Sequence, residues 1–198
     1  MLEEFKKFGR DLFLAGLNNS HSGNLSVHLG DRIIITRRRA MLGHLEEGDL
    51  IETGLTKNDS KITLASTEIG VHQAIYNNTA ALAIVHAHPV HAIALSLIED
   101  EIFPIDSEGS YLLHKIPVLS AEHTIGSQEI EQKLPPLLKE NKIVMVRGHG
   151  SFAVGSVLEE AYQWTTSLEN ICRIIYLTRT LRGDFKDNNS SKHKAWPN

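Results

Sequence analysis

The sequence predicts an α/β fold whose sheet is mostly antiparallel or mixed. Two observations carry this prediction: short apolar strands alternate with amphipathic helices along the 198 residues, and many strand connections are only as long as a hairpin. Connections of that length join antiparallel strands, because a parallel pair needs a crossover of a dozen or more residues. We therefore expect a single domain over residues 1–183, followed by a polar tail over residues 184–198.

The first third of the chain reads as one helix followed by short strands. A helix is expected over residues 2–17, where apolar side chains recur three and four apart. Strands are expected over residues 25–28, 32–36, 50–52 and 61–64. The first two flank Leu29-Gly30-Asp31 and should form a hairpin. Ser66 is expected to cap a helix that runs to about residue 77.

The remaining elements alternate in the same way. An apolar strand over residues 80–85 leads into His86-Ala87-His88, and Pro89 opens a helix to about Leu97. The later elements are a short extended piece (117–119), a helix opened by Ser127 that Pro135-Pro136 could break, strands over 142–146 and 151–154, and a final helix to about Leu181. That last helix is introduced by Ser156 and Glu159, the spacing of a capping box.

Composition excludes several classes of function. A net charge of −4 gives no reason to expect nucleic acid or an anionic membrane as a partner. The single cysteine, Cys172, excludes an internal disulfide, suits a reducing compartment and is expected to be structural. No apolar run approaches ~20 residues, and the first residues carry no signal-peptide pattern. The expected location is the cytoplasm.

Three histidines are candidate metal ligands. His86 and His88 are two residues apart at a strand end, so their imidazoles should point to the same face. His149 lies between two glycines at the end of another strand, where the backbone can approach closely. Three imidazoles with an open position match a catalytic zinc site. The alternative for His86 and His88 alone is two packed or surface histidines.

Glu68 is the candidate proton carrier. It stands in the first turn of the helix after Ser66-Thr67 and could be a fourth ligand, a general base, or both in turn. The alternative is an acid placed there for the helix dipole. His72, one turn later, shares the face of Glu68 and is expected to pack or support rather than bind metal. His91 lies inside the next helix and is not expected to be a ligand.

A second set of residues suits an anion. Gly23-Asn24 opens a strand, Ser66 and Thr67 lie at a helix start, and Arg38 and Arg39 end a strand nearby in the sequence. Free backbone N–H groups, hydroxyls and guanidinium groups all favour phosphate or carboxylate. Together with a metal, these residues suggest a small anionic substrate that is held at one end and polarised at the other.

With these motifs in order, the chain resembles the class II aldolase/adducin family over about residues 5–180. The resemblance is carried by four pieces: Ser22-Gly23-Asn24-Leu25-Ser26, Ser66-Thr67-Glu68 with His72 and Ile75-Tyr76, His86-Ala87-His88-Pro89, and Gly148-His149-Gly150. It implies a three-layer α/β/α fold around a mainly antiparallel sheet, and a homotetramer with active sites at subunit interfaces. It also implies a divalent metal, usually Zn²⁺ and otherwise Mn²⁺, Co²⁺ or Fe²⁺, on His86, His88 and His149. Glu68 resembles the family's acid/base residue, and Asn24, Ser66 and Thr67 resemble its phosphate-binding positions.

Two segments depart from the family pattern. Thr36 is followed by Arg37-Arg38-Arg39 where many members have a Thr-Pro-x-Gly loop around the phosphate. In addition, an acid, Glu108 or Asp106, lies about where fuculose-phosphate aldolases have a catalytic tyrosine, and methylthioribulose-phosphate dehydratases place a glutamate in this segment. The metal-binding half of the site therefore matches the family pattern, whereas the proton-delivering half is altered. If neither acid delivers the proton, Tyr111 is the next candidate for that role.

The resemblance therefore predicts a metal-dependent lyase. The expected reaction is aldol cleavage of a small sugar phosphate through a metal-stabilised enediolate. The same intermediate serves a dehydratase, an epimerase or a decarboxylase acting on a phosphorylated or carboxylated substrate, and these are the alternatives. A non-enzymatic adducin-like interaction protein is a further alternative, although domains of that type lack the three histidines.

Overall fold

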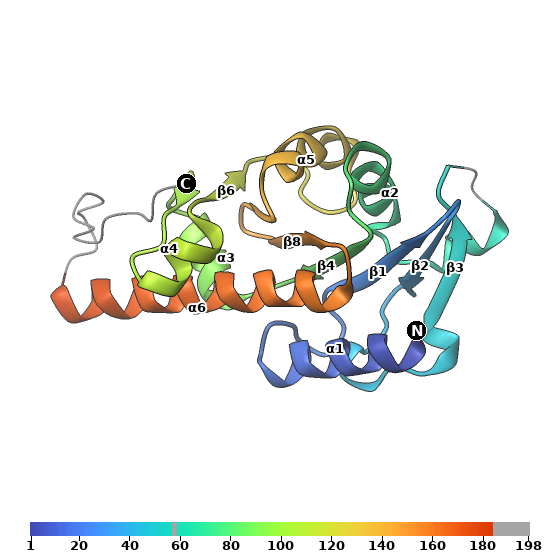
Figure 1. Ribbon diagram of the computed structural model, residues 1–198, viewed down its shortest axis with the longest axis horizontal. Helices are drawn as coiled ribbons and strands as arrows, with labels where there is room; N and C mark the ends of the chain where they lie inside the picture. The colour runs from blue at the N-terminus through green and yellow to red at the C-terminus, as the bar shows by residue number, and fades with distance from the viewer. Residues whose placement is uncertain (57–58, 184–198) are drawn as a thin grey trace.

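The computed structural model describes residues 1–56 and 59–183, so the predicted tail over residues 184–198 lies outside the described part. Helices cover both faces of one sheet (Figure 1). In chain order the elements are α1 (Leu2–Leu14), β1 (Asn24–Leu29), β2 (Arg32–Thr36), η1 (Leu42–His44), η2 (Glu47–Asp49), β3 (Leu50–Gly54), η3 (Ser60–Leu64), α2 (Ile69–Asn78), β4 (Ala83–Ala87), α3 (Val90–Ser96), β5 (Glu101–Ile102), α4 (Ser107–Leu113), β6 (Ile116–Leu119), α5 (Gln128–Glu140), β7 (Ile143–Val146), β8 (Gly150–Gly155) and α6 (Leu158–Arg182).

The sheet is mixed and mainly antiparallel, as predicted. Its strand order is β3-β2-β1-β4-β8-β7-β6-β5, and of the neighbouring pairs only β6 and β7 run parallel. That one parallel pair is joined through α5, which supplies the crossover that parallel strands need. The predicted hairpin also forms: Leu29 pairs with Arg32 across a two-residue turn in which Gly30 has φ +63°.

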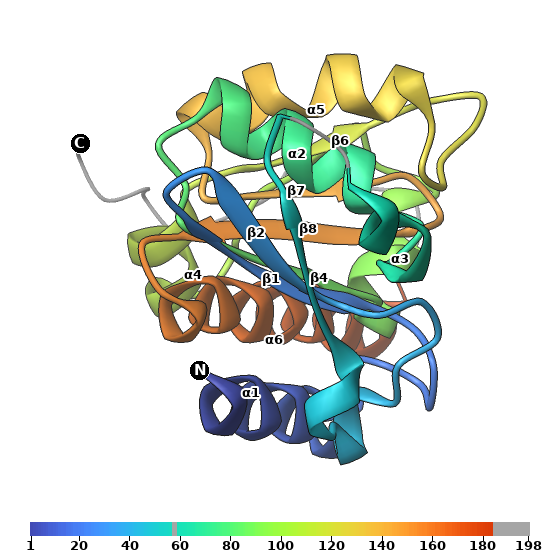
Figure 2. The same cartoon turned by 90° about the vertical axis from the view of Figure 1, so that its right-hand side faces the viewer.

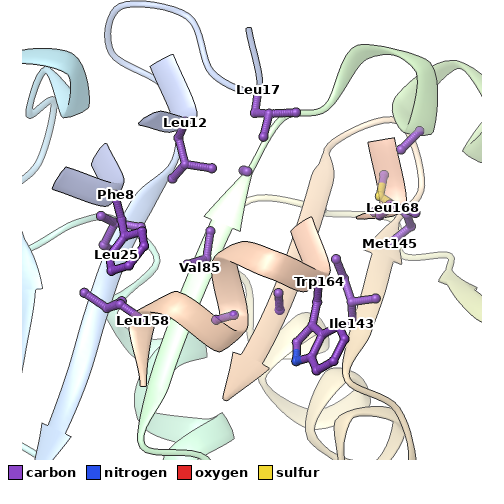
Figure 3. Close-up of a cluster of buried hydrophobic side chains, with 14 of the residues drawn as sticks. Phe8, Leu12, Leu17, Leu25, Val85, Ile143, Met145, Leu158, Trp164 and Leu168 are labelled. Carbon is purple, nitrogen blue, oxygen red and sulfur yellow. The ribbon is translucent and has the colours of Figure 1, made fainter. Parts of the chain in front are cut away.

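The three layers place two cores on opposite sides of the sheet. Figure 2 shows α2 and α5 above the sheet, and α1 and α6 below it. On β4, Val85 packs into the core shared with α1 and α6, whereas Ile84 faces the core of α2 and α5. Figure 3 shows the first of these cores, in which Trp164 of α6 lies near Ile143 of β7. Within the described residues, none of the helices combines the length and apolarity needed to cross a bilayer.

The predicted strand over residues 61–64 is wrong, because η3 occupies this segment. Local side-chain bonds favour the turn: the Asp59 carboxylate accepts from Lys61 N at 3.1 Å, and Thr63 Oγ1 donates to the Ser60 carbonyl at 3.0 Å. The next helix also begins later than predicted, at Ile69. Ser66 Oγ accepts from Glu68 N at 3.3 Å and so closes the turn before the helix.

Two details of the later helices also differ from the predictions. Pro135 and Pro136 do not break α5, which continues to Glu140 with Pro135 in the core. The predicted capping box of Ser156 and Glu159 does not form, because the N-cap of α6 is Val157 and it has no side-chain cap hydrogen bond. The Glu160 carboxylate instead accepts from Ser156 N at 2.7 Å and from Ser156 Oγ at 2.8 Å. Strand β5 and helix α4 were not predicted. Asp106 caps α4 by accepting from Gly109 N at 2.8 Å.

Candidate functional site

His86 and His88 lie together at the end of the central strand β4. His86 is 1% exposed, and its ring stacks on Phe152 of β8 with ring centroids 4.1 Å apart. The Nε2 atoms of His86 and His88 are 3.1 Å apart. The two-residue spacing therefore puts both imidazoles on the sheet face that α2 and α5 cover, as the strand period requires.

His149 reaches the same point from the β7–β8 connection. Its ring centroid lies 4.9 Å from that of His86 and 5.1 Å from that of His88. A Cβ at Gly150 would come within 2.4 Å of the Ala87 carbonyl, so only glycine allows this close approach to β4. The loop is anchored by Arg147 Nε, which donates to Ser120 Oγ at 2.7 Å, and by Gly148 N, which donates to Ser96 Oγ at 3.0 Å.

The three imidazoles fit a divalent cation. One nitrogen from each ring lies within 4.8 Å of the other two. His86 Nδ1 donates to the Ser151 carbonyl at 2.9 Å, which fixes the tautomer and leaves the Nε2 lone pair facing His88. Ligands ~2.0–2.1 Å from a tetrahedral zinc ion lie roughly 3.4 Å apart, close to the spacing of the two Nε2 atoms. One ring nitrogen of His149 lies near the Thr124 backbone, which leaves the other for a cation.

Electrostatics keep these histidines neutral, which is the form that binds metal. Burial, followed by the proximity of His88 and His149, lowers the pKa of His86 well below its usual value. Burial lowers the pKa of His88 to about 4 and also lowers the pKa of His149. A neutral nitrogen donor set of this kind suits zinc and its neighbours in the first transition row.

Glu68 lies beside the histidines at the N-cap of α2. It is 3% exposed, and its Oε1 lies 3.9 Å from His149 Nε2. Gly126 N donates to the same oxygen at 3.2 Å, whereas Oε2 is buried without a partner among the described residues. Burial raises the pKa of Glu68 to about 7, opposed by the Gly126 N–H and reinforced by Glu131. A carboxyl poised near neutrality can both take and give a proton.

The other two histidines singled out lie in separate hydrogen-bond networks. His72 is fully buried; its Nδ1 lies 2.6 Å from Ser26 Oγ, which in turn lies 2.7 Å from the Tyr76 hydroxyl. Burial lowers the pKa of His72 to about 3, so the ring is neutral. His91 Nδ1 lies 2.7 Å from Glu169 Oε1. Neither histidine belongs to the three-histidine group.

Of the candidate anion-binding residues, Asn24 is placed beside the histidines by the sheet. Asn24 lies directly opposite His86 in the β1–β4 ladder. Thr36 joins this strand to the Ser66 turn, because its Oγ1 accepts from Leu25 N at 3.3 Å and its carbonyl accepts from Ser66 N at 3.2 Å. Ser66 is buried, and Thr67 beside it is exposed.

The arginine run divides into one structural residue and two exposed cations. Arg37 forms an ion pair with the buried Asp49 carboxylate. Arg38 and Arg39 have exposed side chains, and neither has a side-chain partner within the described residues. Arg39 has φ +59°, an unusual backbone conformation for a residue other than glycine.

Glu108 is not brought to the histidines within one chain. It is exposed in the first turn of α4, which packs on α6. With Asp106, Thr166 and Asn170 it lines a cavity of about 210 Å³ that includes none of the three histidines.

Sequence reasoning missed several groups that support the site. The Ser151 carbonyl and the Gly126 N–H act through the backbone, and no residue type reveals them in advance. Phe152, which stacks on His86, reads in the sequence only as an apolar strand residue. Asn18 accepts from His88 N through Oδ1 at 3.0 Å. Its position in a polar turn was the only signal available for it.

Comparisons with known proteins identify a family, similar sequences and similar folds. The model of the family described as "Class II Aldolase and Adducin N-terminal domain" matches residues 3–176. The L-fuculose phosphate aldolase of Methanococcus maripaludis strain C7 is 29% identical over 81% of this chain and 87% of its own length. The 3-oxo-tetronate 4-phosphate decarboxylase of Pectobacterium atrosepticum is 28% identical over 88% of this chain and 83% of its own length. The crystal structure of L-fuculose-1-phosphate aldolase from Thermus thermophilus superposes with a TM-score of 0.87 at 34% identity, covering 94% of this chain and 97% of that one.

Proposed function

The chain belongs to the class II aldolase and adducin family, and on that premise we propose that it is a divalent-metal-dependent lyase that cleaves a small sugar phosphate. The observation that carries the proposal is the meeting of three neutral imidazoles with a buried carboxyl whose pKa is raised to about 7. Names among the relatives point the same way, because L-fuculose phosphate aldolases are among them in both sequence and structure.

In this proposal each group has one task. His86, His88 and His149 hold the cation, which supplies Lewis-acid stabilisation of the negative charge that develops on a substrate oxygen. As the C–C bond breaks, Glu68 would take the proton of the hydroxyl whose carbon becomes the aldehyde, and it would then give a proton to the other carbon of the broken bond. Its Oε2, which has no partner among the described residues, is the atom free to do so, since Gly126 N–H occupies Oε1. Asn24, Ser66 and Thr67 hold the anionic end of the substrate.

Decarboxylation is the second candidate reaction. Two observations favour it: a 3-oxo-tetronate 4-phosphate decarboxylase covers 88% of this chain, and Arg38 and Arg39 present two exposed positive charges to an additional anionic group. Decarboxylation would use the same cation, and Glu68 would act there only as the acid that protonates the carbon that loses CO₂. A screen of ketose phosphates and hydroxy-acid phosphates for cleavage products or CO₂ separates the two reactions. If no compound in the panel gave cleavage products or CO₂, the proposed lyase would be refuted.

Arg38→Ala and Arg39→Ala are expected to raise KM more than they lower kcat. Both guanidinium groups are exposed, so their task in this proposal is to bind the anionic end equally in the ground and transition states. Steady-state kinetics at low salt measures the effect. Arg10→Ala removes the same charge from exposed Arg10 on α1 and serves as the control. An unchanged KM in both variants would exclude the two arginines from the binding site.

Glu108→Gln tests whether an acid has replaced the family's tyrosine. If Glu108 delivers a proton to the site, it does so across a subunit interface, because its own chain holds it on α4 away from the histidines. We expect the variant to lose turnover and to retain metal and substrate binding. Glu159→Gln, at an equally exposed first-turn position of α6, is the control. Unchanged turnover would show that another group is the proton donor, and Tyr111 would be the next candidate.

A homotetramer, which the family resemblance implies, is part of the same proposal, and it would let Glu108 act on a neighbouring subunit's histidines. Light scattering is expected to give four times the 22.1 kDa chain mass. A stable monomer with full activity would remove the shared site.

A further inference from the structure

Asn18 is a buried polar side chain to which the proposed function gives no role. It lies in the turn between α1 and β1 and is 6% exposed. The His88 N–H is shared between the Leu17 carbonyl at 2.8 Å and Asn18 Oδ1 at 3.0 Å. Because Oδ1 must be the acceptor of this bond, the orientation of the amide is fixed, and the Nδ2 group faces away from the His88 N–H.

The Asn18 amide fills the space beside Gly23, at the entrance to β1. Gly23 has φ +74°, and a Cβ built on it would lie 2.6 Å from both Nδ2 and Oδ1 of Asn18. The next residue, Asn24, lies opposite His86 in the ladder. The Asn18 amide therefore lies between the turn that precedes Asn24 and the backbone of His88, a candidate metal ligand.

Hydrogen bonds that do not involve the Asn18 side chain also hold the turn. Asn19 N donates to Ser22 Oγ at 2.9 Å, and His21 N donates to Asn19 Oδ1 at 3.1 Å. By contrast, Asn18 Nδ2 and Asn24 Oδ1 are buried without a partner among the described residues. Buried polar groups in folded proteins are almost always paired, so this amide N–H₂ is a donor that a bound water or a ligand oxygen can satisfy.

We propose that Asn18 is a further substrate-binding residue: its Nδ2 donates to an oxygen of the ligand's anionic group, while its Oδ1 fixes the backbone of His88. An anionic oxygen, from a phosphate or a carboxylate, is the strongest acceptor available to such a donor. One side chain then connects the anion subsite to the metal ligands. The identity of the ligand rests on the proposed function, whereas the need for an acceptor does not.

The test uses Asn18→Asp and titrates metal-loaded, full-length protein with inorganic phosphate or glycolate by calorimetry at pH 8. Aspartate matches asparagine in size and keeps an oxygen for the His88 N–H, but replaces the donor with a negatively charged acceptor. We expect metal content to be retained and affinity for one of the two anions to fall at least ~10-fold, as for loss of a hydrogen bond to a charged group. The anion whose affinity falls identifies the chemistry of the subsite.

Asn19→Asp is the matched control, because it adds the same charge one residue away. Asn19 is exposed, and an aspartate there still accepts from His21 N. Its anion affinity is expected to equal that of the wild type. An equal loss in Asn19→Asp would make the effect one of general charge and overturn the inference.

A neutral substitution of Asn18 keeps the inference testable if Asn18→Asp does not fold. Asn18→Ala, checked by thermal unfolding, removes the donor without adding charge and is also expected to weaken anion binding. Wild-type affinity in any folded Asn18 variant, or no binding of either anion to the wild type, overturns the inference. The titration measures binding and not turnover, so the two proposals can fail separately. If the protein bound the anion through Asn18 but cleaved no sugar phosphate, the proposed function would be refuted and the role of Asn18 would stand.

Discussion

Replacing His86, His88 or His149 with alanine is expected to lower bound divalent metal from about one ion per chain to almost none. Each imidazole is one of only three nitrogen donors in the group, so two remain after any single substitution. The loss of affinity should exceed the ~10–100-fold loss that follows removal of a group supporting a ligand. Turnover should disappear with the metal.

Metal analysis after purification, together with a competition titration, measures this effect. His91→Ala is the matched control. His91 follows the same strand and is only three residues from His88, but it lies against Glu169 and outside the three-histidine group. A triple alanine variant that still bound one ion per chain would show that the cation site lies elsewhere.

Glu68→Gln is expected to lower kcat by at least ~10²-fold while metal binding persists. Glutamine matches glutamate in size and keeps an oxygen for the Gly126 N–H, which donates to Glu68 at 3.2 Å. It cannot remove a proton. Steady-state kinetics with measured metal content separates loss of the base from loss of the site, and near wild-type kcat would assign the base to another residue.

The pH profile gives a second measurement of the same residue. As a base, Glu68 must be ionised, so the rate should fall as the pH falls through its pKa. Burial raises that pKa from 4.5 to about 7 in the chain alone, and a bound cation opposes the shift, so the acid limb should lie between these values. Glu131→Gln removes a charge that raises the pKa of Glu68 and should move the limb to lower pH. If the acid limb stayed at the same pH in both Glu131→Gln and Glu68→Gln, it would report the titration of another group.

The parts of the fold that sequence could predict are those governed by short-range periodicity. The Leu29-Gly30-Asp31 hairpin and the shared face of His86 and His88 follow from the strand period and turn chemistry alone. The segment over residues 61–64 shows the limit. Its apolar residues suited a strand, but the bond from Lys61 N to Asp59 competes with sheet pairing, and Leu64 is 58% exposed.

The sequence predicts which side chains form the candidate site, but not the burial, the exposure or the backbone hydrogen bonds of those side chains. The raised pKa of Glu68 depends on its burial beneath the loop that carries Gly126, 58 residues later in the chain. Of the three arginines, Arg37 pairs with Asp49, whereas Arg38 and Arg39 are exposed, and the sequence does not tell the three apart. The role of Asn18 depends on a backbone N–H of His88, 70 residues away. Long-range contacts of this kind leave no pattern in sequence spacing.

The proposed lyase needs a cation on the three histidines for carbon–carbon bond cleavage. Turnover of the ketose-phosphate panel by chelator-stripped protein, before and after one equivalent of Zn²⁺ per chain is restored, tests it most directly. We predict no turnover by the stripped protein and full recovery at one equivalent, with no recovery in His86→Ala. Equal turnover by stripped and restored protein would show that cleavage does not need the cation.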